Sequence, residues 1–235
     1  MRYFFFFFVP LFAVQGQGKI EHQSQIWYGY YLTHSLSKQW YVQGEVHARQ
    51  FVDPAIYSQS AFRAHVHRNI GDKWDLSAGV ALFLNTPNDP LATNRLAVPE
   101  YRPHVEVVYK QRWSKVRFDH RFRAEMRFNR ATNANRTELT DVVNFSNYRL
   151  RYRIQALFPL YKTLQAKLNT EILLNAEQEN PDNYLDQHRM FAGVSIPVRP
   201  NLSVDVGYLH SFQQRSNLNY YDRSILSIMV YHRIP

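Results

Sequence analysis

The chain has 235 residues, a net charge of +9 and no cysteine, which excludes a disulfide framework and thiolate chemistry. Its mean hydropathy of −0.45 excludes a helical membrane protein, and no linker or low-complexity stretch suggests a second domain. Arginine supplies 21 of the 28 basic residues, and most arginines lie in alternating segments rather than in a basic tail.

The N-terminus has the pattern of a secretory signal peptide. Met1 and Arg2 give a positive start, residues 3–14 are almost entirely apolar, and Gly16 and Gly18 supply the small residues that follow. The run is shorter than the roughly 20 apolar residues of a membrane helix. We expect residues 1–18 to be the signal peptide and residues 19–235 to form the mature domain. A soluble nucleic-acid-binding protein would not need such a segment, so no nucleic-acid partner is expected.

Eleven later segments alternate apolar and polar side chains with a period of two, which predicts β-strands. The clearest is 116–129, where Phe118 and Phe122 share one face and Arg121 and Arg123 share the other. Many of these strands are about ten residues long, typical of strands that cross a bilayer, whereas soluble strands average five or six. The predicted strands are 24–33, 40–51, 58–70, 74–85, 100–110, 116–129, 144–157, 164–175, 184–195, 202–212 and 222–234.

The connections between these segments alternate in length. Short ones are expected at 35–38, 71–73, 111–115, 158–163 and 197–201, and longer ones at 52–57, 86–98, 130–143, 176–183 and 213–220. Outer-membrane barrels have short periplasmic turns and long extracellular loops. Trp40, Trp74 and Trp113 flank short turns, which predicts an aromatic girdle at that interface. The alternative is that these rings cap hairpins by cross-strand packing.

The predicted fold class is therefore all-β: a single antiparallel up-and-down transmembrane β-barrel of 10 to 12 strands. Single-chain bacterial barrels have an even number of strands, so twelve is favoured over the eleven segments found. The missing strand would lie before Ile26 or within residues 86–98.

Three short motifs carry a resemblance to a known family. They are the Trp27-containing segment 25–32, the Leu-Ser-Lys turn in 36–40, and segment 45–49, which runs from an acidic residue to an arginine. Through them the chain resembles the bacterial outer-membrane barrel family catalogued as domain of unknown function 2490, frequent in Bacteroidetes. The resemblance covers essentially the whole mature chain. It implies a barrel in the outer membrane and no assigned catalytic residues.

The polar strand faces predict a charged lumen. Guanidinium groups pair with carboxylate or phosphate, so an arginine-rich interior favours a narrow channel for small anionic solutes or a site for an acidic headgroup. The alternative is a salt-bridged plug in a structural barrel. The charged residues expected to line the lumen are Glu45, His47, Arg49, Arg63, His65, His67, Arg102, Glu106, Asp119, Arg121, Arg123, Glu125, Arg127, Arg149, Arg151, Arg153 and Glu171.

The histidines suggest two further interpretations. His47, His65 and His67 near Glu45 could form a zinc or general-base site, but histidines in a wet, charged lumen more often belong to a hydrogen-bonded network. Outward-facing histidines, namely His120, His188 and His210, and the serines Ser146 and Ser211 near loop ends keep a lipid- or lipopolysaccharide-modifying hydrolase as the alternative function. No nucleophile motif is present, so we expect no catalytic residue, metal or cofactor. The expected partners are outer-membrane lipids and small anionic solutes.

Charge pairing also predicts a register between strands 100–110 and 116–129. A register with Glu106 opposite Asp119 would place like charges together and is disfavoured. We expect a turn at Trp113-Ser114 and three opposite-charge pairs: Glu106–Arg121, Arg102–Glu125 and Glu100–Arg127.

Overall fold

The structure is a computed structural model that describes residues 18–161, 163–176, 184–215 and 219–235. The predicted signal peptide lies outside the described residues except for Gly18, as does most of the predicted loop 176–183. The described residues form eleven strands. They are β1 (Ile20–Ser35), β2 (Trp40–Phe51), β3 (Tyr57–Ile70), β4 (Trp74–Asn85), β5 (Val98–Trp113), β6 (Val116–Thr132), β7 (Leu139–Pro159), β8 (Gln165–Ala176), β9 (Leu185–Arg199), β10 (Leu202–Gln214) and β11 (Tyr220–Ile234).

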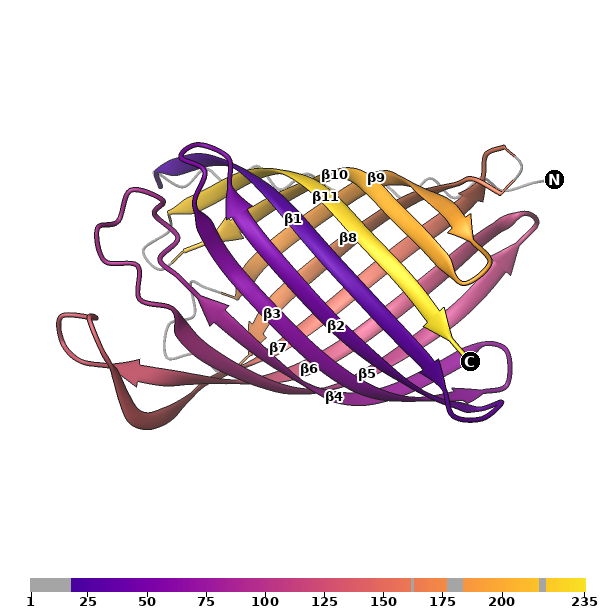
Figure 1. The fold of residues 1–235 in the computed structure, drawn as a ribbon, viewed down its shortest axis with the longest axis horizontal. Coiled ribbons are helices and arrows are strands. Elements are labelled where there is room, and N and C mark those ends of the chain that lie inside the picture. The colour runs from indigo at the N-terminus through magenta and orange to yellow at the C-terminus, as the bar shows by residue number, and fades with distance from the viewer. Residues whose placement is uncertain (1–17, 162, 177–183, 216–218) are drawn as a thin grey trace.

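The strands form one closed barrel in which neighbours in sequence pair in antiparallel fashion (Figure 1). An odd number of strands leaves the first and last running in the same direction, so β1 and β11 close the barrel by parallel pairing, from Ile20–Tyr220 to His34–Ile234. All eleven predicted segments are confirmed as strands, and the all-β barrel of 10 to 12 strands is confirmed. The favoured twelfth strand is not observed in the described residues, because β1 is continuous from Ile20 and residues 86–97 contain no strand.

The predicted alternation of connections is confirmed in part, because the β2–β3 connection, residues 52–56, is no longer than the β7–β8 turn. Short turns of two to five residues join β1–β2, β3–β4, β5–β6, β7–β8 and β9–β10, whereas the β4–β5 connection takes residues 86–97. In Figure 1 the long β4–β5 and β6–β7 connections lie at the left end, and the end of β11 lies at the right. Trp40, Trp74 and Trp113 are exposed beside the short turns. Trp74 also packs cross-strand on Tyr109, with ring centroids 4.7 Å apart. Where described, no helix is long and apolar enough to cross a membrane.

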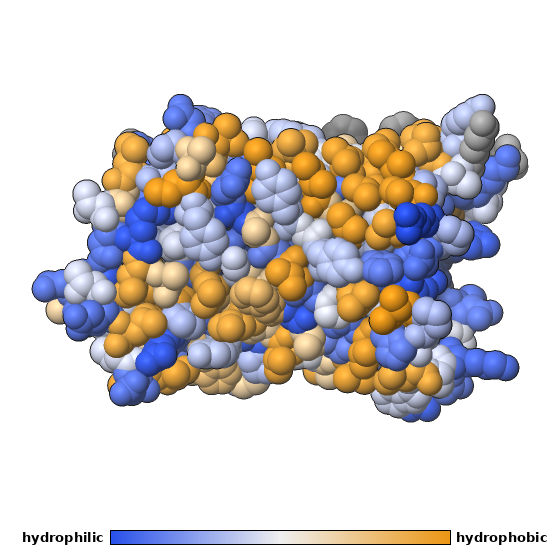
Figure 2. Space-filling model, viewed as in Figure 1, coloured by the Kyte–Doolittle hydropathy of each residue, from blue (hydrophilic) through white to orange (hydrophobic). Residues whose placement is uncertain are grey.

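Charged side chains fill the inside of the barrel and apolar ones cover the outside. On β6, Asp119, Arg123 and Glu125 are buried, while Phe122 is 55% exposed. On β7, Arg151 is buried and its neighbour Leu150 is 50% exposed. Figure 2 shows hydrophobic residues over much of the barrel's side and hydrophilic residues gathered toward its two ends. This is the reverse of a soluble barrel, which hides its apolar face.

The predicted β5–β6 register is wrong. Glu106 lies opposite Arg123, and Trp113 lies opposite Val116, so the turn is Ser114-Lys115 and the strands are displaced by two residues from the predicted pairing. Ser114 has a φ of 55°, the left-handed conformation that tight two-residue hairpins require. A two-residue slip leaves every side chain on its face. The observed register therefore keeps the predicted faces, and it still places opposite charges together at Glu106–Arg123 and Lys110–Asp119.

Candidate functional site

The lumen contains two cavities of about 630 Å³ each. One lies at the long-loop end, where Asn94 of the β4–β5 loop and Arg136 of the β6–β7 loop contribute to its wall. The other lies toward the short-turn end, where Arg117 and Arg233 line it. The two cavities together extend along the barrel from one end toward the other.

The β4–β5 loop reaches across the long-loop mouth. Gln23 of β1 donates to the Asn88 backbone oxygen at 2.8 Å, and Arg223 of β11 donates to Asn88 Oδ1 at 3.2 Å. In the closed barrel, β1 and β11 lie several strands from β4 and β5. The loop therefore narrows the entrance to the first cavity instead of projecting away from it.

Positive charge dominates both cavities. Nine arginines and two carboxylates line the first cavity, and nine arginines, one lysine and four carboxylates line the second. Fourteen of the seventeen predicted lumen residues belong to these walls. The other three, His67, Asp119 and Glu125, are buried within the barrel.

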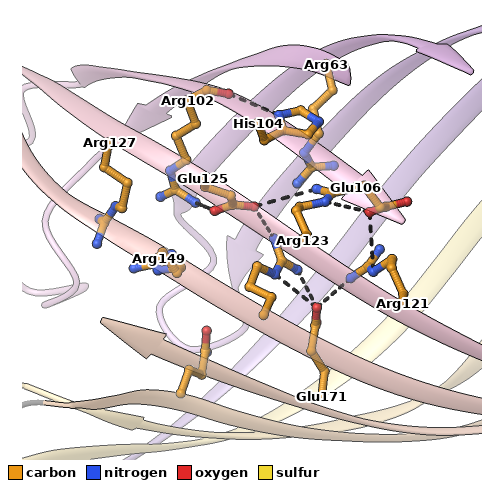
Figure 3. A network of polar contacts seen from close by, with 12 residues as sticks. Arg63, Arg102, His104, Glu106, Arg121, Arg123, Glu125, Arg127, Arg149 and Glu171 are labelled. Carbon is orange, nitrogen blue, oxygen red and sulfur yellow. Dashed lines mark hydrogen bonds and ion pairs between the residues drawn. The ribbon is translucent and has the colours of Figure 1, made fainter. Parts of the chain in front are cut away.

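Several interior carboxylates, among them Glu106, Glu125 and Glu171, are each shared by two or more guanidinium groups (Figure 3). Glu171 Oε1 lies 2.5 Å from Arg121 Nη2 and 2.8 Å from Arg151 Nη2. Glu125 Oε1 accepts from Arg151 at 2.7 Å, linking strands β6, β7 and β8 into one network. Further carboxylate–guanidinium contacts are Glu106–Arg123 at 2.6 Å, Glu100–Arg102 at 2.7 Å, Glu100–Arg127, and Asp186–Arg149 at 3.0 Å.

The buried histidines belong to the same polar network. His65 Nδ1 lies 3.2 Å from His104 Nε2, and Glu45 is 3.4 Å from both His47 and His65. His67 bonds Asp75 at 2.9 Å. Across the described part of the chain, no group of three or more His, Asp or Glu side chains is arranged to hold a metal ion.

Several cavity residues were absent from the predicted set. Arg223 lines the first cavity, Lys167 and Asp205 line the second, and Trp27 and Arg189 line both. Arg189 shares its face with Phe191 and Gly193, and β1 has aromatic side chains on both faces. Period-two alternation alone therefore could not assign Trp27 and Arg189 to the lumen, whereas Lys167 shares its face with the predicted Glu171 and could have been found.

The outward histidines form local polar contacts. His120 lies 2.9 Å from the Tyr152 hydroxyl, and His188 lies 2.8 Å from the Thr170 hydroxyl. His210 Nε2 lies 2.5 Å from Asp222 Oδ1. Of the two serines singled out by sequence, Ser211 is fully buried and accepts a hydrogen bond from Gln187.

A serine that the sequence did not single out lies near the outward His210–Asp222 contact. Ser224 of β11 lies directly opposite His210 of β10 in the register. Its hydroxyl is 2.9 Å from that of Tyr208.

Comparison with known families identifies a match over residues 24–222, to a family described as "Protein of unknown function (DUF2490)". The chain belongs to this family. The predicted resemblance is thus confirmed, and family membership carries no assigned activity. A comparison with curated protein sequences found no match.

Among solved structures, the chain is similar to the NanC porin in a rhombohedral crystal form. The TM-score is 0.53 at 10% sequence identity, over 89% of this chain and 99% of the porin chain. At this identity the similarity concerns the fold alone. The DUF2490 chain therefore has a porin-like β-barrel fold.

Proposed function

We propose that this DUF2490 protein is an outer-membrane barrel that forms a narrow channel for small anionic solutes. The membrane location is supported by the apolar exterior, where Val80 is 60% exposed and Val105 is 58% exposed on neighbouring strands. Side chains of this kind are stable against lipid, whereas a soluble barrel would expose a large apolar surface to water. The porin-like fold supports the same location.

The observation that carries the channel function is the excess of arginine over carboxylate in both cavities. The arginines outnumber the carboxylates nine to two in the first cavity and nine to four in the second, so pairing leaves a net positive charge. A low-dielectric wall around a positive lumen concentrates anions and repels cations. The anion preference should be strongest at low ionic strength, because salt screens the wall charges.

Conductance in planar bilayers tests this function. The purified barrel should give single-channel currents whose reversal potential in a KCl gradient indicates chloride preference, and the preference should decline as salt rises. Arg153 lines the second cavity and makes no ion pair with a described carboxylate. Its substitution therefore removes a wall charge without breaking a salt bridge. Arg153→Gln should reduce the chloride preference. Absence of current from a correctly folded barrel would instead support the salt-bridged structural plug.

One observation favours a second candidate function, hydrolysis of membrane lipid esters. Asp222 places a carboxylate on the outward face, 2.5 Å from His210 and 3.2 Å from His22, with Ser224 opposite His210. Ser224 Oγ would exchange its bond to Tyr208 for one to His210 and attack the ester carbonyl carbon. His210 would take the hydroxyl proton and return it to the leaving alcohol. Water would then hydrolyse the acyl-serine by the same proton route.

Fatty-acid release from phospholipid vesicles distinguishes the two functions. Ser224→Ala and His210→Gln should abolish release, whereas Ser24→Ala, at the outward position beside Ser224, should retain it. If all variants and the wild type release no fatty acid, the hydrolase function is rejected. Conductance of Ser224→Ala should equal that of wild type, because Ser224 lines neither cavity.

A further inference from the structure

Five residues line both cavities and therefore lie at the junction between them, here called the constriction. They are Trp27, Arg49, Arg63, Arg151 and Arg189. These residues come from β1, β2, β3, β7 and β9, so they approach the barrel axis from different sides. A solute that passes from one cavity to the other must pass this ring.

Two of the four arginines in the ring are held by carboxylates. Arg63 Nη1 lies 2.5 Å from Glu45 Oε2. Arg151 contacts Glu125 at 2.7 Å and Glu171 at 2.8 Å. Their charges are largely compensated by these acidic partners.

Arg49 and Arg189 differ from that pair. Arg49 donates to the neutral Gln59 side chain at 2.5 Å and makes no ion pair with a described carboxylate. Arg189 donates to Gln187 at 2.6 Å and lies 3.7 Å from Glu171, which is already shared with Arg151. The Nε atoms of both arginines are buried without a hydrogen-bond partner.

Trp27 orients both of these guanidinium groups. The Arg49 guanidinium carbon lies 3.7 Å from the indole centroid, and that of Arg189 lies 5.4 Å from it. Trp27 is only 5% exposed, and its Nε1 donates to Gln25 Oε1 at 2.8 Å, which fixes the ring. An aromatic face attracts a cation through its quadrupole but carries no net charge. Trp27 therefore holds the two arginines in place without neutralising them.

We propose that Arg49, Trp27 and Arg189 form a binding site for the oxyanion group of a permeating solute, a carboxylate or a phosphate. This inference rests on the channel function proposed above. Guanidinium offers a planar fork of donors that matches both groups, and the two unpartnered Nε atoms supply donors at the constriction. The site would select anions bearing such a group over chloride, which cannot accept a bidentate contact.

Binding can be measured without conduction. Trp27 becomes the only tryptophan in the variant Trp40→Phe/Trp74→Phe/Trp113→Phe, whose three substitutions lie at exposed positions beside the turns. In the folded barrel in detergent, phosphate or acetate should change Trp27 fluorescence saturably, and chloride at equal ionic strength should not. The two titrations distinguish a phosphate preference from a carboxylate preference.

Arg49→Gln and Arg189→Gln in this background should each weaken the apparent affinity at least tenfold. The control is Arg117→Gln, because Arg117 lines the second cavity but is half-exposed and paired with Asp119 at 2.9 Å. It should change the affinity less than twofold. Heat-modifiable migration on electrophoresis reports whether each variant remains folded.

In bilayers, phosphate or acetate should block the wild-type chloride current, and the block should weaken in Arg49→Gln. Equal fluorescence titrations for wild type, Arg49→Gln and Arg189→Gln would overturn the site while leaving an anion-selective channel intact. A barrel that binds the oxyanion through these residues but passes no current would support the site and contradict the channel.

Discussion

At the residue scale, the cavity walls contain fewer carboxylates than guanidinium groups. Glu171 accepts from Arg121 and Arg151 and lies within 3.7 Å of Arg189, so one acidic residue serves three guanidinium groups. Arginines without a carboxylate partner contact neutral groups instead, as the Arg49 guanidinium lies over the Trp27 ring. The interior thus remains positive although its acidic residues are paired.

Glu171→Gln should therefore affect both stability and selectivity. Loss of a buried shared carboxylate leaves uncompensated guanidinium charge, which should lower the free energy of unfolding by about 3 kcal/mol. The released charge should also increase the anion preference of the proposed channel. Urea unfolding in lipid vesicles and reversal potentials measure the two effects.

Asp141→Asn is the matched control for that substitution. Asp141 pairs with Arg130 at 3.0 Å, but its side chain is fully exposed, so its removal should have no measurable effect on stability. Equal stabilities for wild type and Glu171→Gln would show that the lumen is hydrated enough to screen the network.

At the element scale, the β5–β6 hairpin joins its strands through a two-residue turn at Ser114-Lys115. Ser114 adopts a left-handed φ of 55° so that a two-residue turn can join the strands. For a residue with a Cβ atom this conformation costs roughly 1 to 2 kcal/mol. The charge pairs across the hairpin, such as Glu106–Arg123 and Lys110–Asp119, are each worth only about 0.2 to 1 kcal/mol, so the cost of the turn is comparable to their sum.

Substitution at Ser114 tests the role of the turn. Ser114→Gly should raise the free energy of unfolding by about 1 kcal/mol, because glycine adopts positive φ without the Cβ penalty. Ser114→Val should lower it. Lys115→Gly is the control in the same turn and should lower the free energy of unfolding. Lys115 is not among the described residues with positive φ, so glycine relieves no strain there and only increases the conformational entropy of the unfolded chain. A stabilising Lys115→Gly would contradict this account.

At the scale of the whole molecule, the barrel has a polar inside and an apolar outside, which supports the proposed membrane location. Val80 lies in the middle of β4 and is 60% exposed, and Val198 lies at the end of β9 and is 56% exposed. Because the two side chains are about equally exposed, a difference between substitutions at these positions reflects depth in the bilayer and not burial. Depth in the bilayer should then decide how well each position tolerates a charge.

Val80→Arg should lower the free energy of unfolding in vesicles by roughly 2 to 4 kcal/mol, whereas Val198→Arg should cost about 0 to 1 kcal/mol. The reason is that a charge near the bilayer midplane is desolvated, while one at the interface reaches water. If both substitutions proved equally mild, the outer face would be in water and the membrane location would be wrong.

The strands, and the faces of most of their residues, follow from local alternation in the sequence. Alternation is local: Arg121 and Arg123 lie on the face opposite Phe122 whatever the rest of the chain does. The same pattern predicted the loop asymmetry and an arginine-rich interior. It could not assign the inward positions of Trp27 and Arg189, because aromatic or small side chains occupy both faces of their strands.

The closure, the registers and the partners of each charge depend on the folded barrel and cannot be read from local alternation. Parallel pairing of β1 with β11 depends on the total number of strands, and a slip of two residues leaves the alternation unchanged. The meeting of Trp27 with Arg49 and Arg189 joins residues far apart in sequence, on β1, β2 and β9. Such contacts exist only once the sheet has closed, because closure brings distant strands around one lumen.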